Sequence, residues 1–392
     1  MYLIPEFVKI KIIEYPNLER AILGFMNTLY IPQKHLENLK KQIKPNKVVI
    51  IYGPRRCGKT TLLKKFLEGV AEKYLLVNGE DIFVQEYLSS QSIDKLKNFV
   101  GEHQILAIDE AQRIPNVGLN LKLLVDNLEG IKIIATGSAS FDLYQKLGEP
   151  LTGRKTTLRL FPLAQMELIQ IEKPHQIKAH LEARLIFGTY PEVVLAKGDR
   201  EKTIYLRELI SSYLLKDILE MNGLRQSDKL IKILQLLAFQ IGNEVSYSEI
   251  AASVGLNKKT VEKYLDLLEK VFVIIKIKGF SRNLRKEISK SPKYYFYDLG
   301  IRNALINNFN SLSLRNDVGS LWENYIISER IKKQEYLNLF VNNYFWRTYD
   351  RKEIDFVEER KGKLYAYEIK WREEKKLLPK IGSLLILIPN FQ

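Results

Sequence analysis

The chain has 392 residues, of which 46% are hydrophobic and 27% charged, a composition typical of a globular protein with two to four domains. Its 61 Lys and Arg residues exceed its 46 Asp and Glu residues, which gives a formal net charge of +15. This excess is compatible with a polyanionic partner but does not identify one. The single cysteine, Cys57, excludes an intrachain disulfide and a cysteine-based zinc site.

The first residues lack the basic and apolar regions of a signal peptide. No run of about 18 apolar residues predicts a membrane span. A lone cysteine within the loop described next suggests a reducing compartment. We therefore expect a cytoplasmic protein without a membrane partner.

The strongest motif follows an apolar run at residues 48–52, which predicts a buried strand. It reads G-x-x-x-x-G-K-T, and apolar residues at helical spacing follow it. A strand, a glycine loop and a helix N-terminus together bind phosphate, so we expect ATP here rather than an ordinary glycine-rich turn. Lys59 would reach the β- and γ-phosphates, and the Thr60 hydroxyl would bind Mg²⁺. The predicted nucleotide-binding residues are Gly53, Pro54, Arg55, Arg56, Cys57, Gly58, Lys59, Thr60 and Thr61.

A second apolar strand, residues 105–108, ends in the acidic pair Asp109-Glu110. Downstream of a phosphate-binding loop, this pattern predicts a Walker B segment. Asp109 would hold Mg²⁺ through water, and Glu110 would orient and polarise the attacking water. The alternative is a buried strand whose acidic end is merely solvated.

A third apolar strand, residues 131–135, is followed by Thr136, Gly137 and Ser138. Strands alternating with helices predict a parallel sheet with its ligand at the carboxyl edge. Either hydroxyl would then lie beside the γ-phosphate, where it could sense its loss. Each could equally serve as a turn or a helix N-cap.

The order of these segments resembles a prokaryotic group of AAA+ ATPases, in which a nucleotide domain is coupled to a winged helix and a restriction-endonuclease-like C-terminal domain. The stretches that carry the resemblance are residues 53–61, 105–112, 136–138, 151–154, 188–192, 294–300 and 346–348. Thr189 stands where a second glycine is commoner. The resemblance makes Arg154 a candidate arginine finger for a neighbouring copy in a homo-oligomer. A structural ion pair beside Lys155 is the alternative.

Residues 161–226 have a helical pattern and resemble the helical lid of an AAA+ protein. Residues 227–280 predict a winged helix-turn-helix with Gly255 in its turn. Its third helix begins with Lys258 and Lys259, where a recognition helix would meet DNA. The candidate DNA-binding residues are Lys258, Lys259, Lys263, Arg282 and Arg285. The alternative is a winged helix that serves packing or protein contact.

Residues 281–392 contain a second set of acidic residues. Residues 352–357 and 364–371 alternate like neighbouring strands, which would place Glu368 and Lys370 on one face near Asp355. Two carboxylates that hold Mg²⁺ and a lysine that activates water are suited to phosphodiester hydrolysis. Glu323 could add a third acidic metal ligand from a helix. The order of elements resembles the PD-(D/E)xK nuclease fold, although Ile354 replaces the usual proline and the fold alone could serve DNA binding or regulation.

The sequence thus predicts an α/β chain with a P-loop AAA+ parallel-sheet ATPase domain (1–160), a helical lid (161–226), a winged helix (227–280) and a nuclease-like domain (281–392). We expect an Mg²⁺-dependent ATPase that acts on DNA, with DNA cleavage left open. The alternatives are a nucleotide-gated switch that binds DNA or protein with little turnover, and a transcription regulator that reads sequence through its winged helix.

Overall fold

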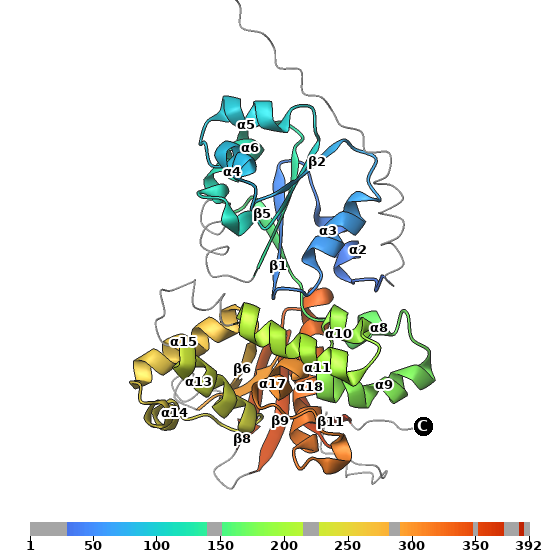
Figure 1. Cartoon of the computed structure of the whole chain (residues 1–392), viewed down its shortest axis with the longest axis vertical. Coiled ribbons are helices and arrows are strands. Elements are labelled where there is room, and N and C mark those ends of the chain that lie inside the picture. Colours follow the sequence, from blue (N-terminus) through green and yellow to red (C-terminus); the bar gives the residue numbers. More distant parts are fainter. Residues whose placement is uncertain are drawn as a thin grey trace, which may run out of the picture. The chain divides into compact units, whose positions relative to one another are not determined.

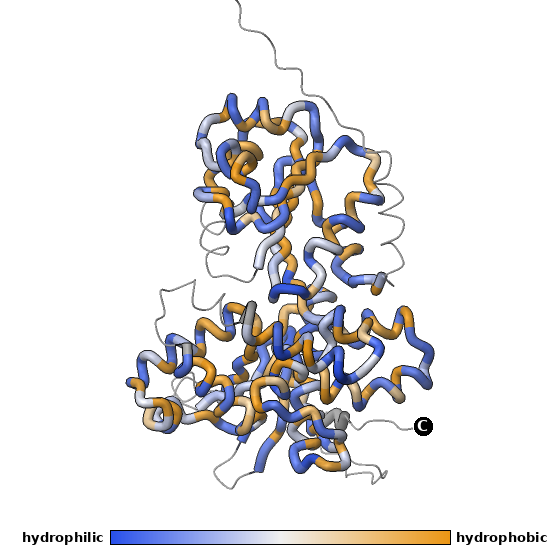
Figure 2. The backbone as a smooth tube through the Cα atoms, viewed as in Figure 1, coloured by the Kyte–Doolittle hydropathy of each residue, from blue (hydrophilic) through white to orange (hydrophobic). Residues whose placement is uncertain are grey.

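The computed structural model describes residues 30–138, 151–214, 227–281, 291–347, 352–371 and 384–387. Two β-sheets organise these residues, one formed by residues 47–159 and the other by residues 274–387 (Figure 1). Figure 2 shows hydrophobic residues along the central strands of the first sheet, whereas the helices alternate between hydrophobic and hydrophilic positions. This pattern is expected for sheets whose faces are covered by helices. Among the described residues, no helix is both long and apolar enough to cross a membrane.

The first sheet is parallel and has the strand order β2-β3-β4-β1-β5. Strands alternate with helices along the chain, as the sequence predicts. The elements are α2 (His35–Gln42), β1 (Lys47–Gly53), α3 (Lys59–Leu67), β2 (Tyr74–Asn78), α4 (Ile82–Leu88), α5 (Ile93–Val100), β3 (Ile105–Asp109), the 3₁₀ turn η1 (Ala111–Arg113), α6 (Val117–Asn127), β4 (Lys132–Ser138) and β5 (Lys155–Arg159).

Strand β1 is buried on both of its faces. Val48 and Ile50 pack in the core that contains residues of α4, α5 and α6, whereas Val49 and Ile51 pack against residues of α2 and α3. Because side chains alternate along a strand, an uninterrupted apolar run can serve two cores at once. This double burial holds the end of β1, where the nucleotide loop begins, in a fixed place.

The helical pattern predicted after residue 161 is confirmed for the described part of this region. Its helices are α8 (Gln165–Leu168), α9 (Pro174–Phe187), α10 (Pro191–Leu195), α11 (Asp199–Glu208) and the π-helix η2 (Leu209–Leu214). Proline occupies the first turn of α9 and of α10, where its missing N–H leaves no unpaired donor.

Three helices and one strand follow in the order that the sequence predicts for residues 227–280, and a second strand comes after them in the chain. They are α13 (Ser227–Phe239), α14 (Tyr247–Val254), α15 (Lys258–Lys270), β6 (Ile274–Gly279) and β7 (Lys293–Phe296). Side chains cap α14 and α15, because Ser246 accepts from the N–H of Glu249 and Asn257 accepts from that of Thr260. Arg282 and Arg285 lie outside the described residues.

The second sheet has the order β11-β10-β9-β8-β6-β7, so it contains β6, which lies in the predicted winged helix, and β7, which lies beyond it in the chain. After β7 the chain forms the helices α17 (Leu299–Leu305), η3 (Leu312–Leu314) and α18 (Val318–Tyr336). The other strands of the sheet follow: β8 (Asn342–Arg347), β9 (Glu353–Arg360), β10 (Lys363–Ile369) and β11 (Leu384–Leu387). Strands β9 and β10 are neighbours, as the alternating sequence predicts, and they run antiparallel.

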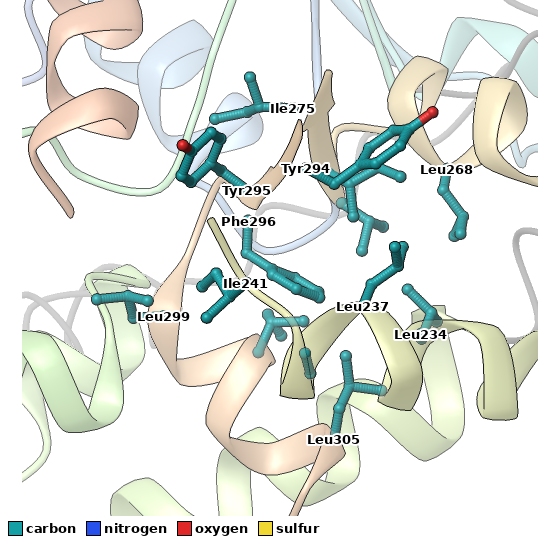
Figure 3. Packing of buried hydrophobic residues seen from close by; sticks show 14 of the residues in the cluster. Leu234, Leu237, Ile241, Leu268, Ile275, Tyr294, Tyr295, Phe296, Leu299 and Leu305 are labelled. Carbon is teal, nitrogen blue, oxygen red and sulfur yellow. The ribbon is translucent and has the colours of Figure 1, made fainter. Parts of the chain in front are cut away.

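One hydrophobic core joins the helices after β5 to the second sheet. In Figure 3, Leu234 and Leu237 of α13, Phe296 of β7 and Leu305 of α17 lie around a common space. Leu185 of α9 belongs to the same core. Residues on both sides of the boundaries that we expected at residues 226 and 280 therefore contribute to one core, and the boundaries themselves stay predictions.

Candidate nucleotide site

The nucleotide loop connects the end of β1 to the start of α3. A Cβ atom at Gly53 would lie 2.0 Å from the carbonyl oxygen of Leu160, so that no larger residue fits there. Gly58 has a φ of 99°, a conformation that side chains disfavour. Both glycines of the motif are thus required by the backbone, and the N–H groups at the start of α3 are available to phosphate.

Lys59 lies folded into this loop. Its Nζ donates to the carbonyl oxygens of Gly53 and Pro54 at 3.1 and 2.9 Å, and the residue is buried. These two hydrogen bonds hold the ammonium group against the backbone of the loop. The thiol of Cys57 is buried in the core beside α3, and burial raises its pKa.

Thr60, Asp109 and Thr136 form a hydrogen-bonded group at the carboxyl edge of the sheet. The Thr60 hydroxyl donates to Asp109 Oδ2 at 2.7 Å, and the Thr136 hydroxyl donates to Asp109 Oδ1. The backbone N–H of Glu110 donates to Thr136 Oγ1 at 3.3 Å. The structure thus brings the loop threonine and the acidic pair together, as the motif spacing predicts.

Glu110 and Ser138 are joined by Gln112, a residue for which the sequence suggested no role. Gln112 Nε2 donates to Glu110 Oε2 at 2.5 Å and to Ser138 Oγ at 3.1 Å. Glu110 itself has a left-handed backbone with a φ of 52°, a conformation that is uncommon for a residue other than glycine. In the sequence, the only signal for this contact would have been the position of Gln112 two residues after Glu110.

Arg154 lies away from the loop of its own chain. Its backbone carbonyl accepts from the N–H of Val48, near the start of β1, whereas the loop follows the end of β1. Its side chain donates to Asp126 at 2.6 Å. This geometry matches the expected alternative, a structural ion pair of Arg154, and its partner is Asp126. An oligomer formed through Arg154 stays a prediction.

Three residues from outside the parallel sheet lie against the nucleotide loop. Gln33 Nε2 donates to the carbonyl of Cys57 at 3.1 Å. Arg56 of the loop pairs with Glu192 of α10 at 3.1 Å and lies over the ring of Tyr205 at 5.8 Å. Sequence reasoning did not connect these residues to the loop, because they are far from it along the chain.

Two of the stretches that carried the resemblance dock against each other. Asp298 Oδ2 accepts from the N–H of Thr189 at 2.7 Å, and Asp298 Oδ1 caps α17 through the N–H of Ile301. A Cβ atom at Gly188 would lie 2.1 Å from Asp298 Oδ1. These residues therefore have a structural part in joining the segment before α10 to α17.

Lys258, Lys259 and Lys263 are exposed at the start of α15, whereas Val261 and Tyr264 of the same helix are buried. The helix thus packs with one face and presents three lysines on the other. Their positive charge is free to meet phosphate, but the same exposure is ordinary for lysines on a solvated helix.

The C-terminal acids lie on β9 and β10. Lys370 Nζ lies 3.3 Å from Glu368 Oε1 and 4.0 Å from Asp355 Oδ2, so the three predicted residues are neighbours. Asp355 Oδ2 also accepts from the N–H of Ile369 at 2.6 Å. Burial raises the pKa of Asp355, as expected for a carboxyl group withdrawn from water.

Glu323 of α18 lies in an adjoining group of polar side chains. Its Oε1 accepts from the Tyr295 hydroxyl at 2.6 Å and lies 3.9 Å from the buried Lys293 Nζ, which also binds Glu353. Burial raises the pKa of Glu323 to about 7. Within the described ranges, no group of three or more His, Cys, Asp or Glu side chains has a geometry that would hold a metal ion.

Residues 45–169 match a family model described as an AAA domain. The match supports an AAA+ family ATPase that binds and hydrolyses ATP. Residues 178–312 and 318–380 match two models, each described as a domain of unknown function (DUF8612 and DUF4143). Neither description names a winged helix or a nuclease, so both stay predictions.

Proteins similar to most of this chain occur in bacteria and archaea. An uncharacterized protein of Mycobacterium tuberculosis is 26% identical over 354 residues, which is 89% of this chain and 76% of that protein. An uncharacterized protein of Methanocaldococcus jannaschii is 26% identical over 344 residues, 82% of this chain and 74% of that protein. A solved Walker-type ATPase of Pyrococcus abyssi covers 70% of this chain and 94% of its own, at 18% identity and a TM-score of 0.46. In the two sequence relatives the similarity extends beyond the AAA domain.

Proposed function

We propose that the chain hydrolyses ATP with Mg²⁺ at the loop formed by residues 53–61 and acts on DNA. The observation that carries the proposal is the hydrogen bond of 2.7 Å between the Thr60 hydroxyl and Asp109. A hydroxyl and a carboxylate held together beside a phosphate-binding loop are the oxygen ligands that Mg²⁺ prefers. The ion, when bound, would neutralise charge on the phosphates.

Each residue of the site would have a separate task in hydrolysis. Lys59 would contact the β- and γ-phosphates, and Thr60 and Asp109 would hold the Mg²⁺ ion. Glu110 would orient and polarise the attacking water. The backbone N–H groups of the loop would bind phosphate oxygens at the N-terminus of α3.

The test is ATP turnover by the full chain with Mg²⁺, compared between wild type and two lysine variants. Lys59→Ala removes the loop ammonium and should lower turnover at least about 100-fold. Lys64→Ala, an exposed residue of the same helix, should leave it unchanged. Equal turnover by wild type and Lys59→Ala would contradict the ATPase proposal.

Action on DNA is proposed from the exposed face of α15. Lys258, Lys259 and Lys263 present positive charge at the end of the helix where backbone N–H groups also favour phosphate. The net charge of +15 would draw a polyanion toward this face. The expected signature is ATP turnover that rises with duplex DNA and loses this stimulation steeply as salt increases.

DNA cleavage is a second candidate function, favoured by the approach of Lys370 to Glu368 and Asp355. Plasmid incubated with Mg²⁺ or Mn²⁺ should then be nicked or cut by wild type. Asp355→Asn keeps an acceptor for the N–H of Ile369 but loses the negative charge, so it should abolish cutting. Glu359→Ala, on the same strand, is the control. Equal cutting by wild type and Asp355→Asn would remove this candidate.

A nucleotide-gated switch is the alternative from another class, favoured by the ion pair between Arg56 and Glu192. Since one partner lies in the nucleotide loop, bound nucleotide could alter the pairing and thereby α10. Hydrogen exchange in residues 191–208 should then differ between the nucleotide-free and ATP-bound wild type. Glu192→Gln should abolish that difference, whereas the exposed Glu208→Gln should keep it. A nucleotide response retained in Glu192→Gln would argue against the switch.

A further inference from the structure

The side chain of Gln112 links Glu110, the predicted catalytic carboxylate, to the hydroxyl of Ser138 at the end of β4. Its Nε2 donates to both Glu110 Oε2 and Ser138 Oγ. A carboxamide nitrogen carries two N–H groups, so one can serve each partner. We propose that Gln112 is a positioning residue for ATP hydrolysis, which makes the orientation of Glu110 depend on the hydroxyl of Ser138. The inference rests on the ATPase function proposed above.

Ser138 lies closer to the start of the nucleotide loop than Thr136 does. In the pairing of β1 with β4, Ser138 is opposite Gly53, the first residue of the loop, whereas Thr136 is opposite Ile51. The Thr136 hydroxyl is already engaged with Asp109 and with the backbone of Glu110. Of the two hydroxyls, that of Ser138 is therefore the one placed to respond to the terminal phosphate.

The chemistry of a hydroxyl group allows Ser138 to serve two partners at once. It has one O–H donor and two acceptor lone pairs, so it can accept from Gln112 while donating to a phosphate oxygen. When the γ-phosphate leaves, the donor loses its partner and the hydroxyl is free to rotate. Gln112 would pass this change directly to Glu110, because the same amide nitrogen binds both.

The amide of Gln112 suits this task because it is neutral and buried. The residue lies in the 3₁₀ turn η1, two positions after Glu110, and is only 8% exposed. A neutral donor orients a carboxylate without the strong attraction of a lysine or arginine, which would compete with the attacking water. Gln112 engages Oε2, so that Oε1 can accept a proton from the water.

The experiment is a double-mutant cycle on the full chain, with steady-state ATP kinetics and Mg²⁺ in excess. Gln112→Met keeps the size of the side chain but removes both donors, and Ser138→Ala removes the hydroxyl. Each should lower kcat roughly 10- to 100-fold and change KM for ATP less than about threefold, since only orientation is lost. The double variant should match the worse single variant within about threefold. Gln104→Met, exposed at the other end of β3, should behave as wild type.

The outcomes separate this inference from the ATPase proposal. Losses of kcat that multiply in the double variant would show that the two residues act independently and would overturn the inference alone. A raised KM or a lowered melting temperature without a fall in kcat would assign Gln112 a structural part and also overturn it. Absence of Lys59-dependent turnover in wild type would overturn the ATPase proposal and, with it, this inference.

Discussion

Thr60 and Asp109 are 49 residues apart in the chain, yet the hydroxyl of one donates to the carboxylate of the other at 2.7 Å. Thr60 lies in the first turn of α3, and Asp109 is the last residue of β3. Strand β4 lies between β3 and β1, so the contact depends on all three strands ending at one edge of the sheet. Because oxygen ligands of both residues meet here, this pair is the basis for the predicted dependence on Mg²⁺.

Thr60→Val and Thr60→Ser form a matched pair that tests this contact. Valine has nearly the shape of threonine but lacks the hydroxyl, so Asp109 loses a donor and the ion loses a ligand. The Mg²⁺ concentration for half-maximal ATP turnover should rise about tenfold or more in Thr60→Val and stay near the wild-type value in Thr60→Ser. An unchanged Mg²⁺ titration of Thr60→Val would contradict the assignment of Thr60 as a ligand.

Gly300→Ala should destabilise the protein because its new Cβ would lie 2.1 Å from the backbone carbonyl of Phe187. We expect a loss of about 1–3 kcal/mol in the free energy of unfolding, since a backbone atom cannot move aside easily. Gly319→Ala is the control: this residue lies in α18 with nothing within 4 Å of a new Cβ. It should gain roughly 0.5–1 kcal/mol. Urea denaturation measures both, and equal effects would contradict the close approach of α9 and α17.

Glu167 should make stability depend on pH. Burial raises its pKa to about 7, although it accepts from the N–H groups of Ala164 and Lys34. Between about pH 4.5 and 7 the unfolded chain ionises while the folded chain keeps the proton. The contribution of Glu167 is therefore complete below pH 4.5 and falls as pH rises to 7, by about 3 kcal/mol.

Glu167→Gln removes this titration and keeps an acceptor for the backbone. The variant should gain stability relative to wild type as the pH is raised from 5 to 8, measured by urea denaturation at each pH. The comparison isolates Glu167, because every other titrating group is common to both proteins. Parallel stability curves would mean that Glu167 titrates at its ordinary pKa in the folded protein.

Lys258→Ala combined with Lys259→Ala should weaken duplex DNA binding in a salt-dependent way. If both residues contact phosphate, the slope of log affinity against log salt should fall by about 2. Lys95→Ala combined with Lys97→Ala removes the same charge from exposed positions of α5 and should leave the slope unchanged. A similar fall in both double variants would indicate a general charge effect rather than binding through α15.

The residues that motifs predicted are those whose conformation or position follows from the residues next to them in the sequence. Gly53 and Gly58 meet backbone demands that arise within a few residues, and Asp109 follows directly from the strand that carries it. Gln112 had no such signal, because its two partners are set by the turn η1 and by the position of β4. Arg154 was assigned by resemblance, and its partner Asp126 lies on a helix that periodicity alone could not orient.

By itself, the sequence determined the phosphate-binding loop, the alternation of strands and helices around it, and the order of later elements. These features depend on local hydrogen bonding, glycine conformation and hydrophobic periodicity, which act over a few residues. Only the tertiary structure decided that α9, α13 and α17 share one core with the second sheet, and that Gln33 and Glu192 contact the loop. Such contacts depend on how whole elements pack, because residues more than 20 positions apart meet only after the chain has folded.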